Sequence, residues 1–133
     1  MPAKQVIVIR KDLKMRRGKE IAQGAHAAMA FLTERLRRGT RYLLSREVSV
    51  TVPLSLPERE WVDGIFTKVC VRVDSEQALL DIERRAKEVG VICHIITDSG
   101  LTEFQGQPTM TCLAVGPDED EKIDRVTGHL ELY

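Results

Sequence analysis

Aromatic residues and long apolar runs are scarce in this chain. One Trp, two Tyr and three Phe make up 5% of the 133 residues, and no RNP-like pattern occurs. Stacking of bases on a sheet is therefore not expected as the main way of binding nucleic acid. No apolar run approaches the roughly 20 residues that span a bilayer, and the N-terminus shows no apolar signal region. We expect a cytoplasmic protein.

Cysteines and nucleophile motifs are equally sparse. Cys70, Cys93 and Cys112 each lie in an apolar, strand-like run, without a C-x-x-C motif or paired histidines. This pattern favours buried thiols over a disulfide framework or a metal site, so we predict no bound metal. The chain lacks a G-x-S-x-G elbow, and the residues around Lys19 do not fit the spacing of a phosphate-binding P-loop. Neither an acyl-enzyme mechanism nor a P-loop ATPase is supported.

The net charge is zero, but the charge is unevenly distributed. Residues 1–46 hold twelve Lys and Arg against three Asp and Glu, a net charge of +9, and the remainder carries −9. A positive N-terminal third can steer a polyanion to one face of the protein. The alternative is that part of this charge belongs to solvated surface residues, with Arg35, Arg37, Arg38 and Arg41 as the candidates.

Hydrophobic periodicity predicts alternating strands and helices. Strands are expected at 5–9, 66–73, 91–97 and 109–115, and helices at 18–38, after Pro57, at 74–89 and at 118–128. Helical crossovers make the first three strands parallel, whereas the direct loop into the fourth permits an antiparallel partner. We predict one domain over residues 1–133, a three-layer α/β fold whose mixed, mostly parallel four-stranded sheet has helices on both faces. Residues 48–56 alternate strictly and predict a possible extra edge strand or extended arm.

The first helix carries two faces of different character. Apolar residues at helical spacing predict a core stripe made of Ile21, Ala25, Met29, Leu32 and Leu36. Lys19, Gln23 and His26 share a neighbouring face. Before any family argument, the default interpretation of His26 is a satisfied core histidine, with a role in the site as the alternative.

The junction between the first strand and this helix is where we expect the chemistry. Its cations are Arg10, Lys11, Lys14, Arg16, Arg17 and Lys19. Because a helix start attracts anions, we expect a phosphate-bearing partner here. Ligands of such sheets bind beyond the carboxyl ends of parallel strands, so Asp98, which ends the third strand, should lie near Lys19. The alternative for Asp98 is an Asx turn with Gly100 at positive φ.

Five motifs in register resemble the type-2 peptidyl-tRNA hydrolase family. They are Asp12-Leu13-Lys14-Met15 with Gly18-Lys19, Gln23-x-x-His26-Ala27-Ala28, Asp98-x-Gly100-x-Thr102, Ala114-Val115-Gly116-Pro117 and Thr127-Gly128-His129-Leu130. Their order and separation match along nearly the whole chain. The resemblance implies hydrolysis of the ester between peptide and tRNA, recycling tRNA, with no metal or organic cofactor.

The resemblance also implies a set of site residues. Lys19, Asp98 and His26 are the expected catalytic residues. Substrate-binding roles are expected for Gln23, Thr102, Lys14, Arg16, Arg17 and Lys11. The partner would be peptidyl-tRNA, with no membrane involved, and the protein would be a monomer or a homodimer.

The loop at 103–108 differs from the usual family sequence. An acid at Glu103 is expected to repel phosphate and to raise the pKa of Asp98. One alternative is therefore a catalytically silent tRNA- or RNA-binding module on the same fold. Another is a protein-interaction adaptor that uses residues 48–56 for strand addition.

Overall fold

The computed structural model describes residues 2–44 and 46–133. In chain order its elements are β1 (Ala3–Arg10), η1 (Lys11–Leu13), α1 (Arg17–Arg38), β2 (Thr40–Leu44), β3 (Glu47–Thr51), α2 (Leu56–Asp63), β4 (Lys68–Val73), α3 (Glu76–Val89), β5 (Cys93–Asp98), η2 (Phe104–Gly106), β6 (Thr109–Glu119) and α4 (Asp120–Thr127). Among these described helices, none is both long and apolar enough to cross a bilayer.

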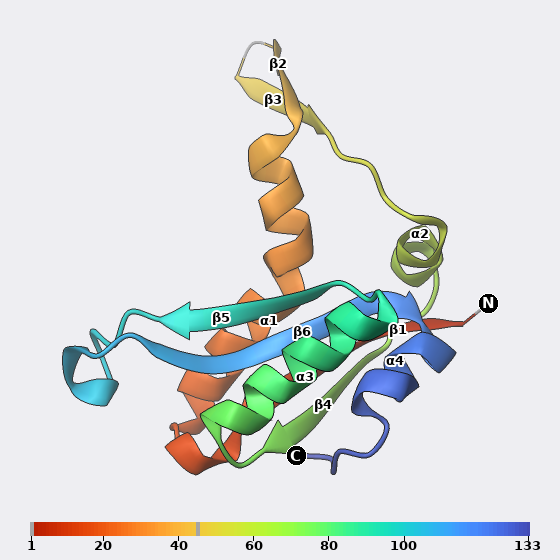
Figure 1. Cartoon of the computed structure of the whole chain (residues 1–133). Coiled ribbons are helices and arrows are strands. Elements are labelled where there is room, and N and C mark those ends of the chain that lie inside the picture. Colours follow the sequence, from red (N-terminus) through yellow and green to blue (C-terminus); the bar gives the residue numbers. More distant parts are fainter. Residues whose placement is uncertain (1, 45) are drawn as a thin grey trace.

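Four strands form one mixed sheet in the order β4-β1-β6-β5. β1 pairs with β4 in parallel, while β6 runs antiparallel to both of its neighbours, β1 and β5. Strands β1, β4 and β5 therefore run in one direction, as predicted, although only one of the three pairings is parallel. Helices cover both faces, with α3 and α4 on one side and α1 on the other (Figure 1). The predicted fold class is confirmed.

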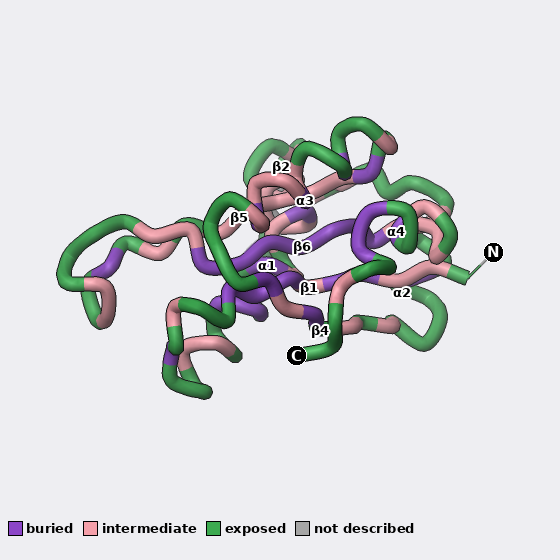
Figure 2. The backbone as a smooth tube through the Cα atoms, turned by 60° about the horizontal axis from the view of Figure 1, so that its bottom comes forward, coloured by how far each residue is buried: buried purple, intermediate pink, exposed green. Residues whose placement is uncertain are grey.

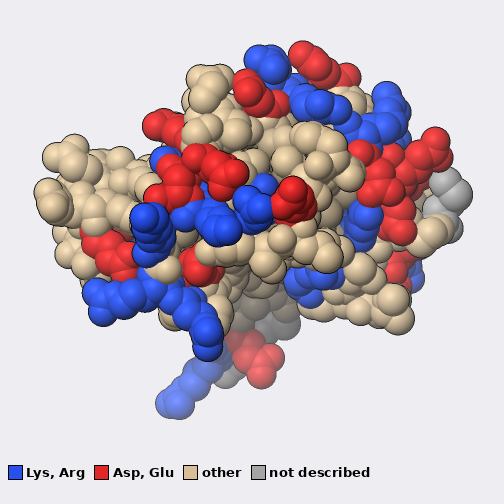
Figure 3. Space-filling view, turned by 90° about the horizontal axis from the view of Figure 1, so that it is seen from below, with Lys and Arg blue, Asp and Glu red and all other residues tan. Residues whose placement is uncertain are grey.

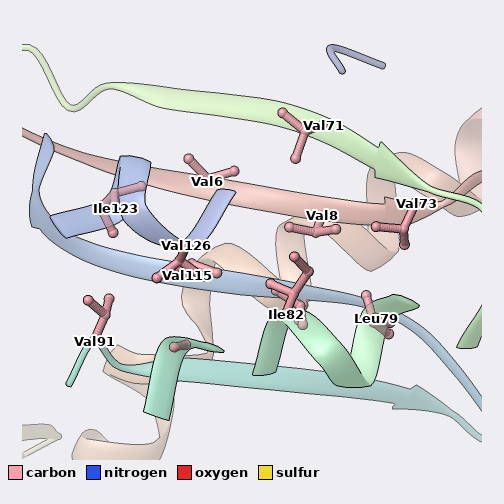
Figure 4. Close-up of a cluster of buried hydrophobic side chains, with 12 residues drawn as sticks. Val6, Val8, Val71, Val73, Leu79, Ile82, Val91, Val115, Ile123 and Val126 are labelled. Carbon is pink, nitrogen blue, oxygen red and sulfur yellow. The ribbon is translucent and has the colours of Figure 1, made fainter. Parts of the chain in front are cut away.

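The larger core lies between the sheet and the pair α3 and α4. Its buried side chains are mostly branched aliphatic residues that meet from three strands and two helices (Figure 4). Leu79 and Ile82 of α3 pack here with Ile123 of α4. Burial is concentrated along the inner strands β1 and β6 (Figure 2). This packed face holds the strands rigidly, so that their carboxyl ends form a fixed edge for the site.

On the opposite face, α1 packs mainly over β1, β5 and β6. Its buried residues are Gln23, Gly24, Ala27 and Phe31. The predicted core stripe is therefore wrong: Ile21 is 67% exposed and Met29 48% exposed. Helix α1 instead turns Gly24 and Ala27 toward the sheet, because these small residues let the helix and the sheet approach each other closely. A Cβ on Gly24 would be in ordinary van der Waals contact, 3.9 Å, with a side-chain methyl of Ile7.

The segment predicted as a possible edge strand at 48–56 is also different in the structure. β2 and β3 pair with each other as a separate antiparallel hairpin at the far end of α1, away from the main sheet (Figure 1). Helix α1 ends before Gly39, as predicted, and the chain turns directly into β2. Residues 56–63 form α2, whose start is fixed by a capping box between Ser55 and Glu58.

The prediction of buried thiols is correct only in part. Cys112 is buried and Cys93 partly buried, and burial raises the pKa of these thiols to about 11 and about 12. Cys70 is exposed, because it lies on β4 where α1 leaves the sheet uncovered.

Candidate functional site

Lys19 and Asp98 meet at the edge of the sheet where β5 ends and α1 begins. The Lys19 ammonium donates a hydrogen bond of 2.9 Å to Oδ1 of Asp98, across 79 positions of sequence. Both side chains are largely buried, with 16% and 12% of their surface exposed. The topology explains this contact, because β1 and β5 run in the same direction and deliver the following segments to the same edge.

Three further side chains extend this pair into a network, which we call the polar cluster: Lys19, Gln23, Asp98, Thr102 and Thr111. Lys19 also donates to the Thr102 hydroxyl at 3.1 Å, and the Gln23 amide donates to Asp98 Oδ1 at 3.3 Å. The hydroxyl of Thr111, on β6, donates in turn to the Gln23 amide oxygen. Gln23 is buried, so its amide has one fixed orientation and holds Asp98 in place.

The loop after β5 fixes the second oxygen of Asp98. The backbone N–H of Gly100 donates to Asp98 Oδ2 at 2.9 Å, and Gly100 has φ = 82°. A Cβ at this position would lie 2.4 Å from the carbonyl oxygen of Gln107. The Asx turn is thus present, and it coexists with the Lys19 contact. The turn aims one carboxylate oxygen at the lysine.

The electrostatics of the pair differ from the sequence-based expectation. The hydrogen bond from the Lys19 ammonium is the largest cause that lowers the pKa of Asp98, against an opposing effect of desolvation. The expected rise caused by Glu103 is wrong. Instead, Glu103 accepts a hydrogen bond of 3.2 Å from the Arg16 guanidinium and ties the 98–108 loop to the start of α1. Asp98 is consequently held as a carboxylate.

The predicted phosphate-binding cations surround the start of α1. Lys11, Lys14, Arg16 and Arg17 are all exposed there. By contrast, Arg10 is buried, where it pairs with Asp12 and donates to the carbonyl of Met110. Seen from the end where α1 begins, acidic side chains lie among the basic ones (Figure 3). On this face, therefore, the positive charge is interrupted by acidic side chains.

His26 lies outside the polar cluster. It is exposed on α1, three residues after Gln23, and within the described residues no hydrogen bond joins it to Lys19 or Asp98. The interpretation as a core histidine is therefore wrong. Thr111, in turn, was missed by the sequence analysis. Its only signal was a polar residue inside the apolar run 109–115.

A large hollow lies elsewhere in the described part of the chain. A groove of about 770 Å³ lies between α1 and α2, over the uncovered side of β1 and β4. We call it the apolar groove, and its lining includes Ile21, Met29, Leu32, Trp61, Val62 and Phe66. Most of the lining is apolar, although Glu20, Lys68, Cys70 and Tyr133 also border the groove. The polar cluster is the better candidate for chemistry.

Comparison with known proteins identifies what the chain is similar to. The family model described as "Peptidyl-tRNA hydrolase PTH2" matches residues 3–133. A "Peptidyl-tRNA hydrolase" of Methanocaldococcus jannaschii is 40% identical over 129 residues, covering 97% of this chain and 98% of that protein. Its counterpart in Haloquadratum walsbyi is 36% identical over 130 residues, covering 98% and 99%.

Two further matches are more distant or less complete. A "Probable peptidyl-tRNA hydrolase 2" of Dictyostelium discoideum is 36% identical over 130 residues, covering 98% of this chain and 54% of that protein. Among solved structures, a protein of unknown function from Agrobacterium superposes with a TM-score of 0.57 at 15% identity, covering 100% and 98% of the two chains. The last match supports the fold alone.

Proposed function

Since this chain belongs to the peptidyl-tRNA hydrolase PTH2 family and releases tRNA from peptidyl-tRNA, we propose that Lys19 and Asp98 carry that hydrolysis. The observation that carries the proposal is the buried contact of 2.9 Å between the two side chains at the sheet edge. The family assignment also favours the hydrolase over a catalytically silent RNA-binding module.

Lys19 supplies the electrophilic group. Within the described residues, two of its three N–H donors have partners, Asp98 Oδ1 and Thr102 Oγ1. The third donor is left for the carbonyl oxygen of the ester. As water adds to the carbonyl carbon, negative charge develops on that oxygen, and a fixed ammonium in a partly buried site stabilises it. The bond to the ribose oxygen then breaks, and this oxygen takes a proton that the attacking water supplied.

Asp98 acts as the group that orients both Lys19 and the water. A carboxylate offers about four lone-pair positions, and hydrogen bonds from Lys19, Gln23 and Gly100 occupy three. The remaining position, on Oδ2, can accept a hydrogen bond from the attacking water. Because its pKa is lowered, Asp98 is a weak base. Orientation of the water therefore suits it better than full removal of a proton.

The surrounding residues bind the rest of the substrate. Gln23 and Thr102 hold the pair in place, while the four exposed cations at the start of α1, Lys11, Lys14, Arg16 and Arg17, contact RNA phosphates. His26 reaches the substrate from the exposed side of α1. We place the reaction in the cytoplasm, because peptidyl-tRNA is a product of translation, and cell fractionation tests that location.

Variants of the central pair test the assignment. We expect Lys19→Ala and Asp98→Asn each to lower kcat on peptidyl-tRNA by about 100-fold or more, because each removes half of the catalytic pair. Asp124→Asn is the matched control, since it disrupts the Lys4–Asp124 ion pair of 2.6 Å elsewhere in the protein. Near-normal kcat in a folded Lys19→Ala or Asp98→Asn variant would refute the assignment.

A further inference from the structure

Helix α1 carries a line of polar residues that leads away from the catalytic pair. Lys19, His26 and Arg37 are spaced by 7 and 11 residues, and at about 100° per residue these positions fall within about 20° of one another. They share one face of the helix. The 18 steps along the helix from Lys19 to Arg37 span about 27 Å at 1.5 Å per residue.

The surface beside this line is hollowed and open. A shallow groove of about 440 Å³ runs along α1, lined by Ala22, Ala25, His26, Met29, Thr33 and Arg37. Three of these six side chains, Ala22, Ala25 and Thr33, are small, so a chain molecule can approach the helix backbone closely beside them. The groove ends at Arg37, on the last turn of α1, where the β2–β3 hairpin begins.

We call this end of the molecule the basic arm: the last turn of α1, residues 35–38, with Gly39 and the β2–β3 hairpin. Arg37, Arg38, Arg41 and Arg46 are all exposed on it. Glu47 is the acidic residue of this segment, and Glu34 of the preceding turn pairs with Arg38 at 3.1 Å. The arm projects from the body of the protein (Figure 1).

Contacts with neighbouring residues hold the basic arm in a fixed position. A Cβ on Gly39 would lie 2.7 Å from a methyl of Val50 and 2.8 Å from the carbonyl oxygen of Thr51, so the hairpin packs directly against the helix end. Arg35 donates two hydrogen bonds to Glu58, at 2.7 and 2.8 Å. These bonds fix the segment that follows the hairpin to helix α1. A fixed arm can present its cations at a defined distance from Lys19.

We propose that the tRNA backbone follows this face of α1 from Lys19 to the basic arm, where Arg37, Arg38 and Arg46 bind phosphates of the RNA stem. The inference rests on the proposed function, since Lys19 marks the position of the ester at the 3′ end. Guanidinium groups match phosphate oxygens in geometry and charge. The span of about 27 Å takes the contact beyond the terminal nucleotides. An acidic protein bound to the arm is the competing occupant.

The experiment compares two sets of three neutralised cations. The arm variant is Arg37→Gln/Arg38→Gln/Arg46→Gln; Arg41 is kept because it donates to the carbonyls of Leu36 and Arg37 at the helix end. The control variant is Arg84→Gln/Lys87→Gln/Arg125→Gln, on α3 and α4 at the opposite face. Both are assayed over a range of salt concentrations on full-length peptidyl-tRNA, and on the same acyl ester carried by a short 3′-terminal oligonucleotide without a stem.

We expect the arm variant to raise KM for full-length peptidyl-tRNA about tenfold and to reduce the slope of log kcat/KM against log salt by about 2 to 3, because three phosphate contacts are lost. Its kcat and its KM for the short ester should change less than about twofold, while the control variant keeps the wild-type KM. Thermal melting verifies that both variants fold.

Several results would overturn the proposal. An unchanged KM for full-length peptidyl-tRNA would leave the acidic protein as the occupant of the arm. Equal changes in the arm and control variants would indicate general electrostatic attraction only, and an equal rise in KM for the short ester would place the effect in the catalytic site. None of these results bears on Lys19 and Asp98, whose variants lose turnover on both substrates.

Discussion

The polar cluster and the apolar groove lie on two sides of the same helix and differ in almost every property. The cluster is small, and Lys19, Gln23 and Asp98 are joined in it by hydrogen bonds. The groove has a volume of about 770 Å³ and an apolar lining that includes Ile21 and Met29. Size alone would select the groove as the site.

Our proposal places the chemistry where polar groups converge, and not in the apolar groove. Ester hydrolysis needs a positive charge near the carbonyl oxygen and a group that orients water, and the cluster holds an ammonium, Lys19, 2.9 Å from a carboxylate, Asp98. The groove results from geometry: α1 sits over β1, β5 and β6, so part of the sheet toward β4 stays uncovered. One helix thus serves two surfaces, with its buried residues Gln23, Gly24 and Ala27 between them.

The largest expected effect is on kcat, and it tests whether Lys19 and Asp98 act together in catalysis. We expect the double variant Lys19→Ala/Asp98→Asn to lose about as much kcat as the more severe single variant, roughly 100-fold or more. Because each partner acts through the other, removal of the second adds little. Steady-state kinetics of the two single variants and the double variant measure this. Losses that multiply would show that the two groups act independently.

A second test asks whether the groove lining behaves as surface or as core. Ile82→Ala, in the core between α3 and the sheet, should lower the free energy of unfolding by about 2 to 5 kcal/mol, because Ile82 is 3% exposed. Ile21→Ala, in the groove, should change it by less than about 0.5 kcal/mol, because Ile21 is 67% exposed. Urea unfolding compares the two. A large loss in Ile21→Ala would mean that another molecule covers the groove.

The smallest expected effect is a change in folding stability with pH. The hydrogen bond from Lys19 lowers the pKa of Asp98 in the folded state, so Asp98 stabilises the fold above its unfolded pKa of about 4. That contribution disappears as the pH falls through the lowered, folded pKa. We expect the stability difference between wild type and Asp98→Asn to shrink over this acidic range. The difference between wild type and Ile21→Ala should stay constant, and urea unfolding at several pH values tests both.

Part of the site could be read from the sequence because topology leaves few choices. A buried strand followed by a helix, and a second strand that ends in Asp98, place Lys19 and Asp98 at one edge once the strands run in the same direction. Gly90 marked the end of α3 for a local reason, since it adopts the left-handed conformation with φ = 86°, whereas Gly39 at the end of α1 is extended and makes room for the hairpin. Gln23 was predicted beside them by helical spacing, and it lies there.

Other features depended on which surfaces of the helices and strands pack against one another, and local spacing in the sequence does not specify this. The spacing of Ile21, Ala25 and Met29 shows that they share a face of α1, but it carries no information on which face approaches the sheet. Strict alternation at 48–56 left open an edge strand of the sheet or an extended arm, and in the structure residues 47–51 pair with β2 in a hairpin at the end of α1. The apolar surroundings of Cys70 suggested burial, although the strand is covered on only one face there.

The sequence by itself determined the order of strands and helices, the helix ends and the pairing of an ammonium with a carboxylate, since these follow from local spacing and from the direction of the strands. Only the tertiary structure decided that Gly24 and Ala27 face the sheet, that an apolar groove remains beside α1, and that the hairpin stands apart with its arginines. The physical reason is that periodicity defines the faces of a helix, while close packing between elements selects the face that is buried.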